Sequence, residues 1–260
     1  MFGVGVGVRV GGFTASSGGG FDPDAQAFFD RVTTAGGTLS ETEKNATNQL
    51  VLDMKDAGIW SSMKAVYPMV GASAAACAQN LKSSSFTGTF TSGWTFASTG
   101  VTGNGTSSYF DTSLNVLSNL SQNNTHLSFY SRTDNDQAGV DIGTENTTIQ
   151  YYAGTLYYRI NTTTYAAAGA QPSDGFTLSS RITTTQQKVY KNGSILNTDN
   201  QGTNAQDNRN IYLGAWNELI KFPTDREYAF CSIGDGLSDA QVSNFNTAVQ
   251  AFQTTLSRQV

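Results

Sequence analysis

The sequence predicts a mainly β protein: an antiparallel β-sandwich with a small helical unit before it and one helix after it. Leu127 and Phe129 alternate with Ser128 and Tyr130, the pattern of a strand with one buried face. An Asn-Gly pair at residues 192–193 lies between two strand-like runs and suits both positive-φ positions of a type I′ hairpin turn. Similar short runs and polar turns recur through most of the downstream chain.

The composition fits a globular protein with a polar but weakly charged surface. Of the 260 residues, 38% are hydrophobic, enough for a core, and only 13% are charged, about half the usual roughly 25%. The net charge of -5 and the lack of any Lys/Arg cluster argue against nucleic-acid binding. Because no run of about 18 apolar residues occurs, we expect no membrane span, and the N-terminus does not read as a secretory signal.

Residues 1–20 predict an extended, Gly/Val-rich anchoring arm. Small residues alternate there with larger apolar ones, which are Phe2, Val4, Val6, Val8 and Val10. Glycine weakens an isolated strand, so we expect the arm to order by adding as a strand to a neighbouring subunit. A tail without structure is an equal alternative. No helix start and no Lys-Ser/Thr pair follows, which excludes a phosphate-binding loop.

Residues 21–70 predict a small helical unit. Asp22 can cap a helix whose first residue is Pro23, and Ser40 with Glu43 forms a capping box for a second helix. Apolar residues continue through residues 59–67, and we expect helix as far as the proline at residue 68.

Residues 71–260 predict the sandwich and its closing helix. The tyrosine-rich run 149–160 has Ala153-Gly154 at its centre, so we expect a hairpin there. Ser238 and Gln241 repeat the capping box. The apolar residues that follow recur at helical spacing: Val242, Phe245, Val249 and Phe252. We expect this helix to pack back on the sandwich.

Few residues suit catalysis. His126 is the only histidine, and we interpret it as structural or solvent-facing. Cys77 and Cys231 have neither metal-ligand spacing nor a disulfide framework, so we expect reduced, buried thiols. No Gly-x-Ser-x-Gly elbow occurs, and no Glu-x-Asp-x-x-Glu pattern occurs. Carboxylates paired from distant strands stay open as an alternative, but we expect no enzyme activity and no cofactor.

Three acidic residues partly match a calcium loop. Asp134, Asp136 and Glu145 take its first, third and twelfth positions, and Gly139 takes the sixth. Ala138 occupies the fifth position, and no helices are expected on either side. A solvated turn is therefore the favoured interpretation, and a calcium site is the alternative.

Aromatic residues are the better candidates for binding. The candidates are Trp94, Trp216, Tyr151, Tyr152, Tyr157 and Tyr158, because alternate tyrosines of a strand must face outward. Of these we select Trp94, Tyr151, Tyr157 and Trp216. Flat apolar faces with polar tips can stack on sugar rings or pack on a neighbouring subunit. Packing within the core and on the sheet surface is the alternative.

The sandwich portion resembles the concanavalin A/laminin G-like domains. Residues 103–111 are similar to their F-x-G-x-x-D-Y-V segment, residues 189–193 to their Y-V-N-G hairpin, and residues 233–241 to their L-S-D-A-E exit. The three segments occur in the family's order and cover roughly residues 85–260. The resemblance implies a jelly roll of two curved antiparallel sheets.

The whole chain also resembles a type of tailed-phage virion protein that recurs in crass-like phages. The matching segments are residues 1–5, 21–28, 58–60 with 63–68, and 251–260. This resemblance implies a capsid decoration, head fibre or tail fibre on the virion, assembled in the cytoplasm of the host bacterium. It also implies capsid or tail proteins as partners, and a homo-oligomer, with a trimer suggested by the analogy to fibres.

Three functions follow as hypotheses. The first is a non-enzymatic virion structural protein, anchored through its arm and displaying a lectin-like jelly roll. The second is a tail-fibre receptor-binding protein that binds a glycan on the host surface. The third, ranked last, is a polysaccharide-active enzyme.

Overall fold

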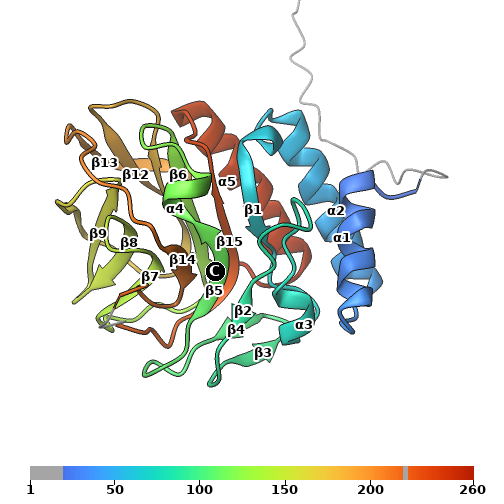
Figure 1. Ribbon diagram of the computed structural model, residues 1–260. Coiled ribbons are helices and arrows are strands. Elements are labelled where there is room, and N and C mark those ends of the chain that lie inside the picture. The colour runs from blue at the N-terminus through green and yellow to red at the C-terminus, as the bar shows by residue number, and fades with distance from the viewer. Residues whose placement is uncertain (1–19, 219–221) are drawn as a thin grey trace, which may run out of the picture.

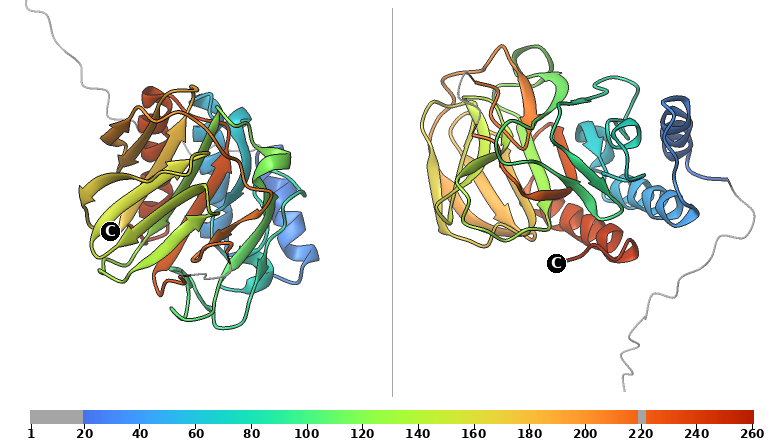
Figure 2. Two further views of the ribbon diagram at one scale, coloured as in Figure 1. Left: turned by 60° about the vertical axis from the view of Figure 1, so that its left-hand side comes forward. Right: turned by 90° about the horizontal axis from the view of Figure 1, so that it is seen from below.

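The computed structural model describes residues 20–218 and 222–260. In this part of the chain, two antiparallel sheets form a sandwich, and helices cover one side of it (Figure 1). We call the helix-covered sheet the inner sheet and the other one the outer sheet. Seen from below, the helices stand on one side of the two sheets (Figure 2). The predicted mainly β sandwich is confirmed.

The inner sheet has the order β13-β12-β11-β6-β15-β4-β3, and β1 also pairs with β15. Its strands are β1 (Met63–Tyr67), β3 (Thr95–Ala97), β4 (Gly100–Thr102), β6 (Thr125–Ser131), β11 (Gly175–Arg181), β12 (Gln187–Lys191), β13 (Ser194–Asp199) and β15 (Glu227–Gly234).

The outer sheet has the order β10-β9-β8-β7-β14-β5-β2. Its strands are β2 (Thr89–Phe90), β5 (Phe110–Asn115), β7 (Gly139–Gly143), β8 (Thr147–Tyr152), β9 (Thr155–Ile160), β10 (Ala166–Ala170) and β14 (Asn210–Leu213). The helices are α1 (Pro23–Thr34), α2 (Glu41–Asp56), α3 (Ala74–Cys77), α4 (Val116–Asn119) and α5 (Asp239–Thr255), with a 3-10 turn, η1, at Trp60–Ser62.

The long helices begin where their capping signals predict. The Asp22 side chain accepts from the backbone N–H of Asp24 at the start of α1. Complete capping boxes begin α2, at Ser40 and Glu43, and α5, at Ser238 and Gln241. A capping side chain satisfies a backbone N–H that has no partner within the helix, and this fixes where the helix starts.

Two apolar cores lie between the three layers. Phe245 of α5 packs on Phe230 of the inner sheet, and Phe28 of α1 and Tyr130 of the inner sheet belong to the same cluster. A second core fills the space between the sheets, where Phe129 of the inner sheet belongs to the same cluster as residues of β7, β8 and β9. The other face of the outer sheet is turned away from both cores (Figure 1).

Two expectations about single strands need correction. Helix was expected up to residue 68, but Met63–Tyr67 form β1. Their side chains divide between the two cores, Val66 toward the helices and Tyr67 toward the outer sheet, which only a strand's twofold alternation allows. The run at Leu127 was expected to bury one face, but β6 is buried on both because helices cover the inner sheet.

Turns at the hairpins follow their sequence. Asn192 and Gly193 have φ values of 47° and 79°, as a type I′ turn between β12 and β13 requires. Ala153 and Gly154, with φ values of 49° and 74°, turn the chain between β8 and β9. Within the described ranges, no helix combines the length and apolarity needed to cross a bilayer. The arm residues Phe2, Val4, Val6, Val8 and Val10 lie outside these ranges.

Candidate functional site

A cavity of about 190 Å³ lies on the uncovered face of the outer sheet. Backbone and side chains from β7, β8 and two loops surround it: Gly139, Val140, Gln150, Tyr152, Tyr165, Trp216 and Phe222. Four of these seven residues are aromatic, and we call the cavity the aromatic pocket.

The register of β8 decides which tyrosine reaches this pocket. Gln150 pairs with Val140 of β7 on one side and with Tyr157 of β9 on the other. Gln150 and Tyr152 therefore share the outward face, and Tyr152 is 52% exposed. Tyr151, one residue away, points into the core between the sheets and is 0% exposed.

Backbone hydrogen bonds hold the segment that carries Trp216 and Phe222 against β7. The N–H of Val140 donates to the carbonyl of Phe222 at 3.0 Å, and the N–H of Gly214 donates to the carbonyl of Asp141 at 2.7 Å. The ring centroids of Trp216 and Phe222 lie 6.2 Å apart. The chain segment that carries both rings is thus anchored to β7, the strand that contributes Gly139 and Val140 to the pocket.

Arg159 of β9 contacts two of the aromatic rings that line the pocket. Its guanidinium carbon lies 3.9 Å from the ring centroid of Tyr165 and 5.4 Å from that of Trp216. Burial lowers the pKa of Arg159, yet a guanidinium stays charged at neutral pH. A cation between two aromatic faces attracts both, so Arg159 holds the two rings in place.

Asp207 fixes the turn against which Trp216 rests. The indole N–H of Trp216 donates to the carbonyl of Thr144, in the turn between β7 and β8. Asp207, 7% exposed, accepts from the Thr144 hydroxyl and from the backbone and side-chain N–H groups of Asn146, the latter two at 2.6 Å. These bonds position the indole indirectly, through the turn.

Acidic residues gather at one rim of the pocket. Glu145 follows Thr144 in the same turn, and Glu218 lies two residues after Trp216. The hydrogen bond to Glu218, together with burial and the charges of Glu218 and Asp207, raises the pKa of Glu145. Glu218 also lies 3.0 Å from a guanidinium nitrogen of Arg209. Acidic side chains thus lie beside Trp216, and Arg209 and Arg159 offset part of their charge.

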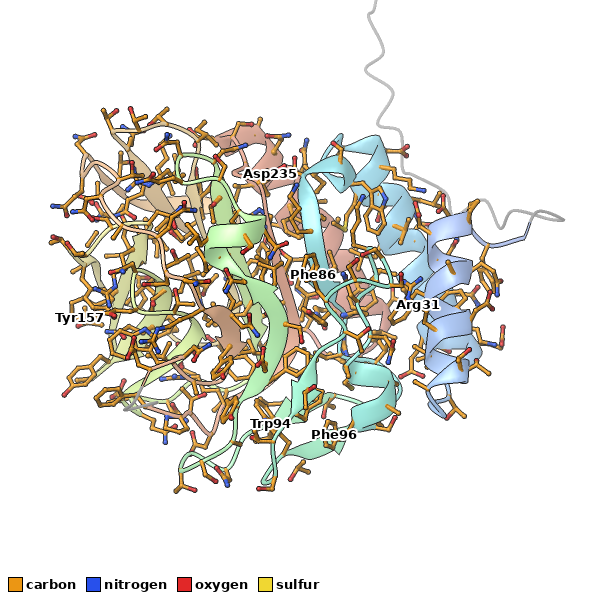
Figure 3. All side chains as sticks on the ribbon, in the orientation of Figure 1. Arg31, Phe86, Trp94, Phe96, Tyr157 and Asp235 are labelled. Atoms are coloured by element: carbon orange, nitrogen blue, oxygen red, sulfur yellow. The ribbon has the colours of Figure 1, made fainter. Side chains whose placement is uncertain are left out.

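The four aromatic residues selected from the sequence have different surroundings. Trp216 lines the aromatic pocket. Tyr157 projects from the outer sheet beside Tyr165, with ring centroids 6.2 Å apart, but does not line the cavity (Figure 3). Tyr151 is core. Trp94 is partly buried and packs on Phe90 at 5.4 Å, so its role is in packing.

Several pocket residues were not selected from the sequence. Gln150, Tyr165 and Phe222 come from separate segments, and nothing local marks them as neighbours. Tyr165 and Gln150 meet through a hydrogen bond of 3.2 Å across two strands. Tyr152 could have been selected by testing both alternations of the β8 run.

The structure does not bring the calcium candidates together. Asp134 and Asp136 precede β7, whereas Glu145 follows it, and a five-residue strand separates them by roughly 16 Å. Asp134 accepts instead from the backbone N–H of Ser173 at 2.9 Å. Across residues 20–218 and 222–260, no group of three or more His, Cys, Asp or Glu side chains could hold a metal ion.

His126 is fully buried and bonded on both ring nitrogens. Nδ1 donates to the carbonyl of Asp235 at 2.6 Å, and Nε2 lies 3.1 Å from the Ser232 hydroxyl. Burial lowers the pKa of His126 to about 4. Cys77 and Cys231 are buried free thiols. The structural role expected for all three residues fits these environments.

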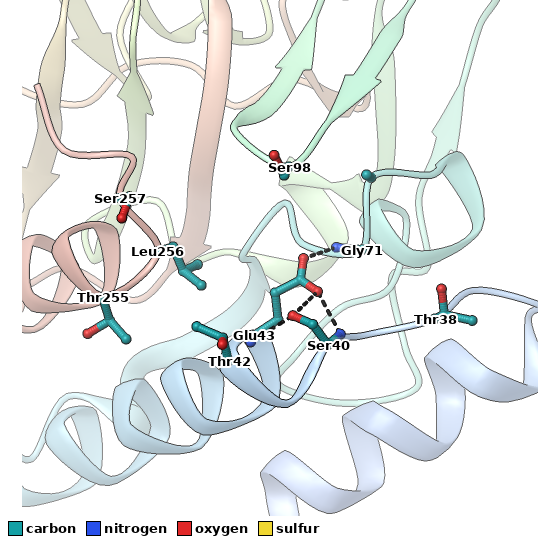
Figure 4. Close-up of a pocket in the computed structure, with 10 residues that line it drawn as sticks. Thr38, Ser40, Thr42, Glu43, Gly71, Ser98, Thr255, Leu256 and Ser257 are labelled. Carbon is teal, nitrogen blue, oxygen red and sulfur yellow. Dashed lines mark hydrogen bonds between the residues drawn. The ribbon is translucent and has the colours of Figure 1, made fainter.

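A larger cavity, of about 500 Å³, lies between the start of α2 and the end of α5 (Figure 4). Hydroxyl groups line much of it, and Glu43 is the acidic residue in its lining. That carboxylate already accepts from the backbone and hydroxyl of Ser40, each at 2.8 Å, and from the N–H of Gly71 at 2.7 Å. Its charge serves the capping box, which makes this cavity the weaker candidate.

Comparison with known proteins identifies the fold. No family model and no curated protein matches the sequence. The botulinum neurotoxin serotype D binding domain is similar in structure, with a TM-score of 0.51 and 12% identity over 73% of this chain and 52% of that one. The chain thus spans about half of that domain.

Two further structures are similar at a lower level. Domain 4 of an extracellular arabinanase from Geobacillus stearothermophilus, in complex with arabinotriose, has a TM-score of 0.49 and 15% identity over 71% of this chain and 98% of that one. A Trypanosoma rangeli sialidase has a TM-score of 0.49 and 10% identity over 78% and 39%. At 12% identity, the likeness to the neurotoxin binding domain shows the fold alone, which in this chain is a sandwich of two antiparallel sheets.

Proposed function

We propose that this protein is a non-enzymatic, lectin-type jelly roll that binds a glycan in the aromatic pocket. One observation carries the proposal: Tyr152, Tyr165, Trp216 and Phe222 surround a cavity on the uncovered sheet face. Aromatic rings at an open surface offer apolar faces for a sugar ring, while the Gln150 amide and tyrosine hydroxyls offer hydrogen bonds. The assignment rests on the site, because one fold hosts many functions.

Catalysis is less well supported by the carboxylates at the rim. Glu145 and Glu218 interact with each other strongly enough to raise the pKa of Glu145. Glycosidases that retain configuration hold their two carboxyl groups about 5–5.5 Å apart, and those that invert it hold them farther apart, so that sugar or water fits between. The strong mutual interaction of Glu145 and Glu218 does not fit a pair held apart by a sugar or a water molecule. We therefore expect no hydrolysis that depends on Glu145.

The binding proposal is tested by removing one ring. Trp216→Ala should weaken binding of the best ligand from a glycan array at least about tenfold, or about 1.4 kcal/mol. Tyr109→Ala is the matched control, since Tyr109 stacks on Tyr212 at 4.4 Å and does not line the pocket. Equal affinity of the Trp216 variant and the wild type would show that the glycan binds elsewhere or not at all.

We further propose, from the sequence resemblance, that this module is carried on a phage virion as a decoration or fibre subunit. Residues 1–20 would anchor it to capsid or tail proteins, and the jelly roll would be displayed outward. A chain lacking residues 1–20 should fold and bind sugar normally but fail to join the particle. Incorporation at the level of the full chain would contradict the anchoring role.

A further inference from the structure

We infer that the aromatic pocket takes an uncharged, terminal sugar unit and rejects sugars that carry a carboxylate. This inference deepens the proposed glycan binding and depends on it. Three features of the structure support it: the chemistry of the lining, the burial and contacts of Arg159, and the charge at the rim.

The seven residues that line the pocket carry no charged side chain. Its polar atoms are those of an amide, Gln150, and of two phenols, Tyr152 and Tyr165. The Tyr165 hydroxyl donates to Gln150 Oε1 at 3.2 Å, which aligns the amide and leaves its N–H₂ group facing other partners. Such groups match the hydroxyls of a sugar, whereas carboxylates are usually recognised by a paired guanidinium.

The guanidinium of Arg159 lies against two of the rings that line the pocket and is almost fully buried. Arg159 is 5% exposed, with its faces against Tyr165 and Trp216. Its Nη1 donates to the carbonyl of Thr163 at 2.9 Å, and its Nε is buried and has no hydrogen-bond partner in the described part of the chain. The two-pronged contact that binds a carboxylate needs two neighbouring N–H groups at the surface. Arg159 thus supports the aromatic walls and is not placed to receive an anion.

The exposed Glu145 near Trp216 would disfavour an anion. Glu145 is exposed and belongs to the turn that accepts the indole N–H, and its charge acts on Arg159 and Tyr165. Arg209 balances Glu218 at 3.0 Å, and Asp207 adds a further negative charge behind the turn. A sugar carboxylate at this rim would face Glu145 as a like charge, and like charges disfavour binding.

The size of the cavity limits how much of a glycan enters. At about 190 Å³ it is smaller than the roughly 300 Å³ at which pockets for drug-sized ligands begin. A volume of this size suits one sugar ring better than several. The inference therefore assigns it to the ring at an end of the glycan.

The test uses sugars that differ only at one carbon. Methyl glycosides of glucose, galactose and mannose are compared with the methyl glycosides of the matching uronic acids, which carry a free carboxylate, by NMR titration of the full chain at pH 8 and low salt. We expect at least one neutral glycoside to bind about tenfold or more tightly than its uronide. In Glu145→Gln the ratio of the uronide dissociation constant to that of the neutral glycoside should decrease. In the control Glu41→Gln, on the remote helix α2, this ratio should stay the same.

The outcomes separate the inference from the proposed function. A uronide that binds as tightly as its neutral partner, with binding lost in Trp216→Ala, overturns the neutral-sugar inference and keeps the glycan site. If no sugar binds in a manner that depends on Trp216, glycan binding at this pocket is itself overturned. A neutral preference that survives in Glu145→Gln at full strength refutes the role of the rim.

Discussion

At the residue scale, the burial of His126 predicts how the unfolding free energy depends on pH. Burial places the pKa of His126 at about 4, below the value of about 6.5 expected in the unfolded chain. The unfolded state therefore binds the proton first. The stabilisation is present above pH 6.5 and is lost as the pH falls toward 4, by up to about 3 kcal/mol.

Urea unfolding at pH 7 and pH 4 checks this expectation. Carboxylates also titrate in this range, so the wild type is compared with His126→Gln. The variant should be less stable at pH 7, because it disturbs the contacts to Asp235 and Ser232, but it should lose less stability on acidification. Identical losses in both proteins would show that His126 does not titrate on unfolding.

Single residues also show where sequence patterns stop being informative. The run with Tyr151 and Tyr152 predicts that one tyrosine faces outward, and this is confirmed. The pattern does not say which one, because both alternations fit a tyrosine pair. Pairing with β7, whose register shifts between Val140 and Ile142, decides it, and that contact is not local. The choice of Tyr151 as a ligand-binding residue is at odds with its full burial.

At the element scale, the turn between β7 and β8 depends on one carboxylate. In Asp207→Ala, the Thr144 hydroxyl and two N–H groups of Asn146 lose their acceptor, and we expect a loss of about 2–3 kcal/mol in unfolding free energy. Glycan affinity should also fall, because Trp216 rests on this turn. Asp207→Asn keeps one acceptor oxygen, so its stability and its glycan affinity should lie between those of the wild type and of Asp207→Ala. If Asp207→Ala bound the glycan as tightly as the wild type, Asp207 would not position Trp216 through this turn.

Elements with local signals could be predicted, and others could not. The beginnings of α1, α2 and α5 follow from Asp22, Ser40 and Ser238, which cap within three residues. β1 was expected as helix, because a run of five apolar-rich residues fits either period. Its partner β15 lies more than 160 residues away in the chain. Only that pairing makes it a strand.

At the scale of the whole molecule, Arg258 joins the layers. It is fully buried and donates to the carbonyls of Pro68, Met69 and Ala229 and to the side chain of Gln253, at 2.7–3.1 Å. These partners belong to the segment after β1, to β15 and to α5. Nothing local in the sequence marks this clamp, because two of its contacts span about 190 residues.

Replacing this clamp should weaken the entire fold. Arg258→Met removes the donor to the buried carbonyls of Pro68 and Met69 and one of the two donors to that of Ala229, and we expect a loss of about 3 kcal/mol or more in urea unfolding, with one cooperative transition. The control Lys44→Met removes an exposed pair with Glu41 and should change stability by less than about 0.5 kcal/mol. Equal stability of the two variants would contradict a joining role for Arg258.

The three tryptophans give the most direct test of glycan binding at the aromatic pocket. Trp60 lies in the helical layer between Lys55 and Lys82, Trp94 packs on Phe90, and Trp216 lines the pocket. Their indole N–H signals are recorded by NMR while a neutral glycoside is added. We expect the Trp216 signal to shift in a saturable manner while the other two stay in place. Shifts confined to Trp60 or Trp94, or no shift at all, would contradict binding at this site.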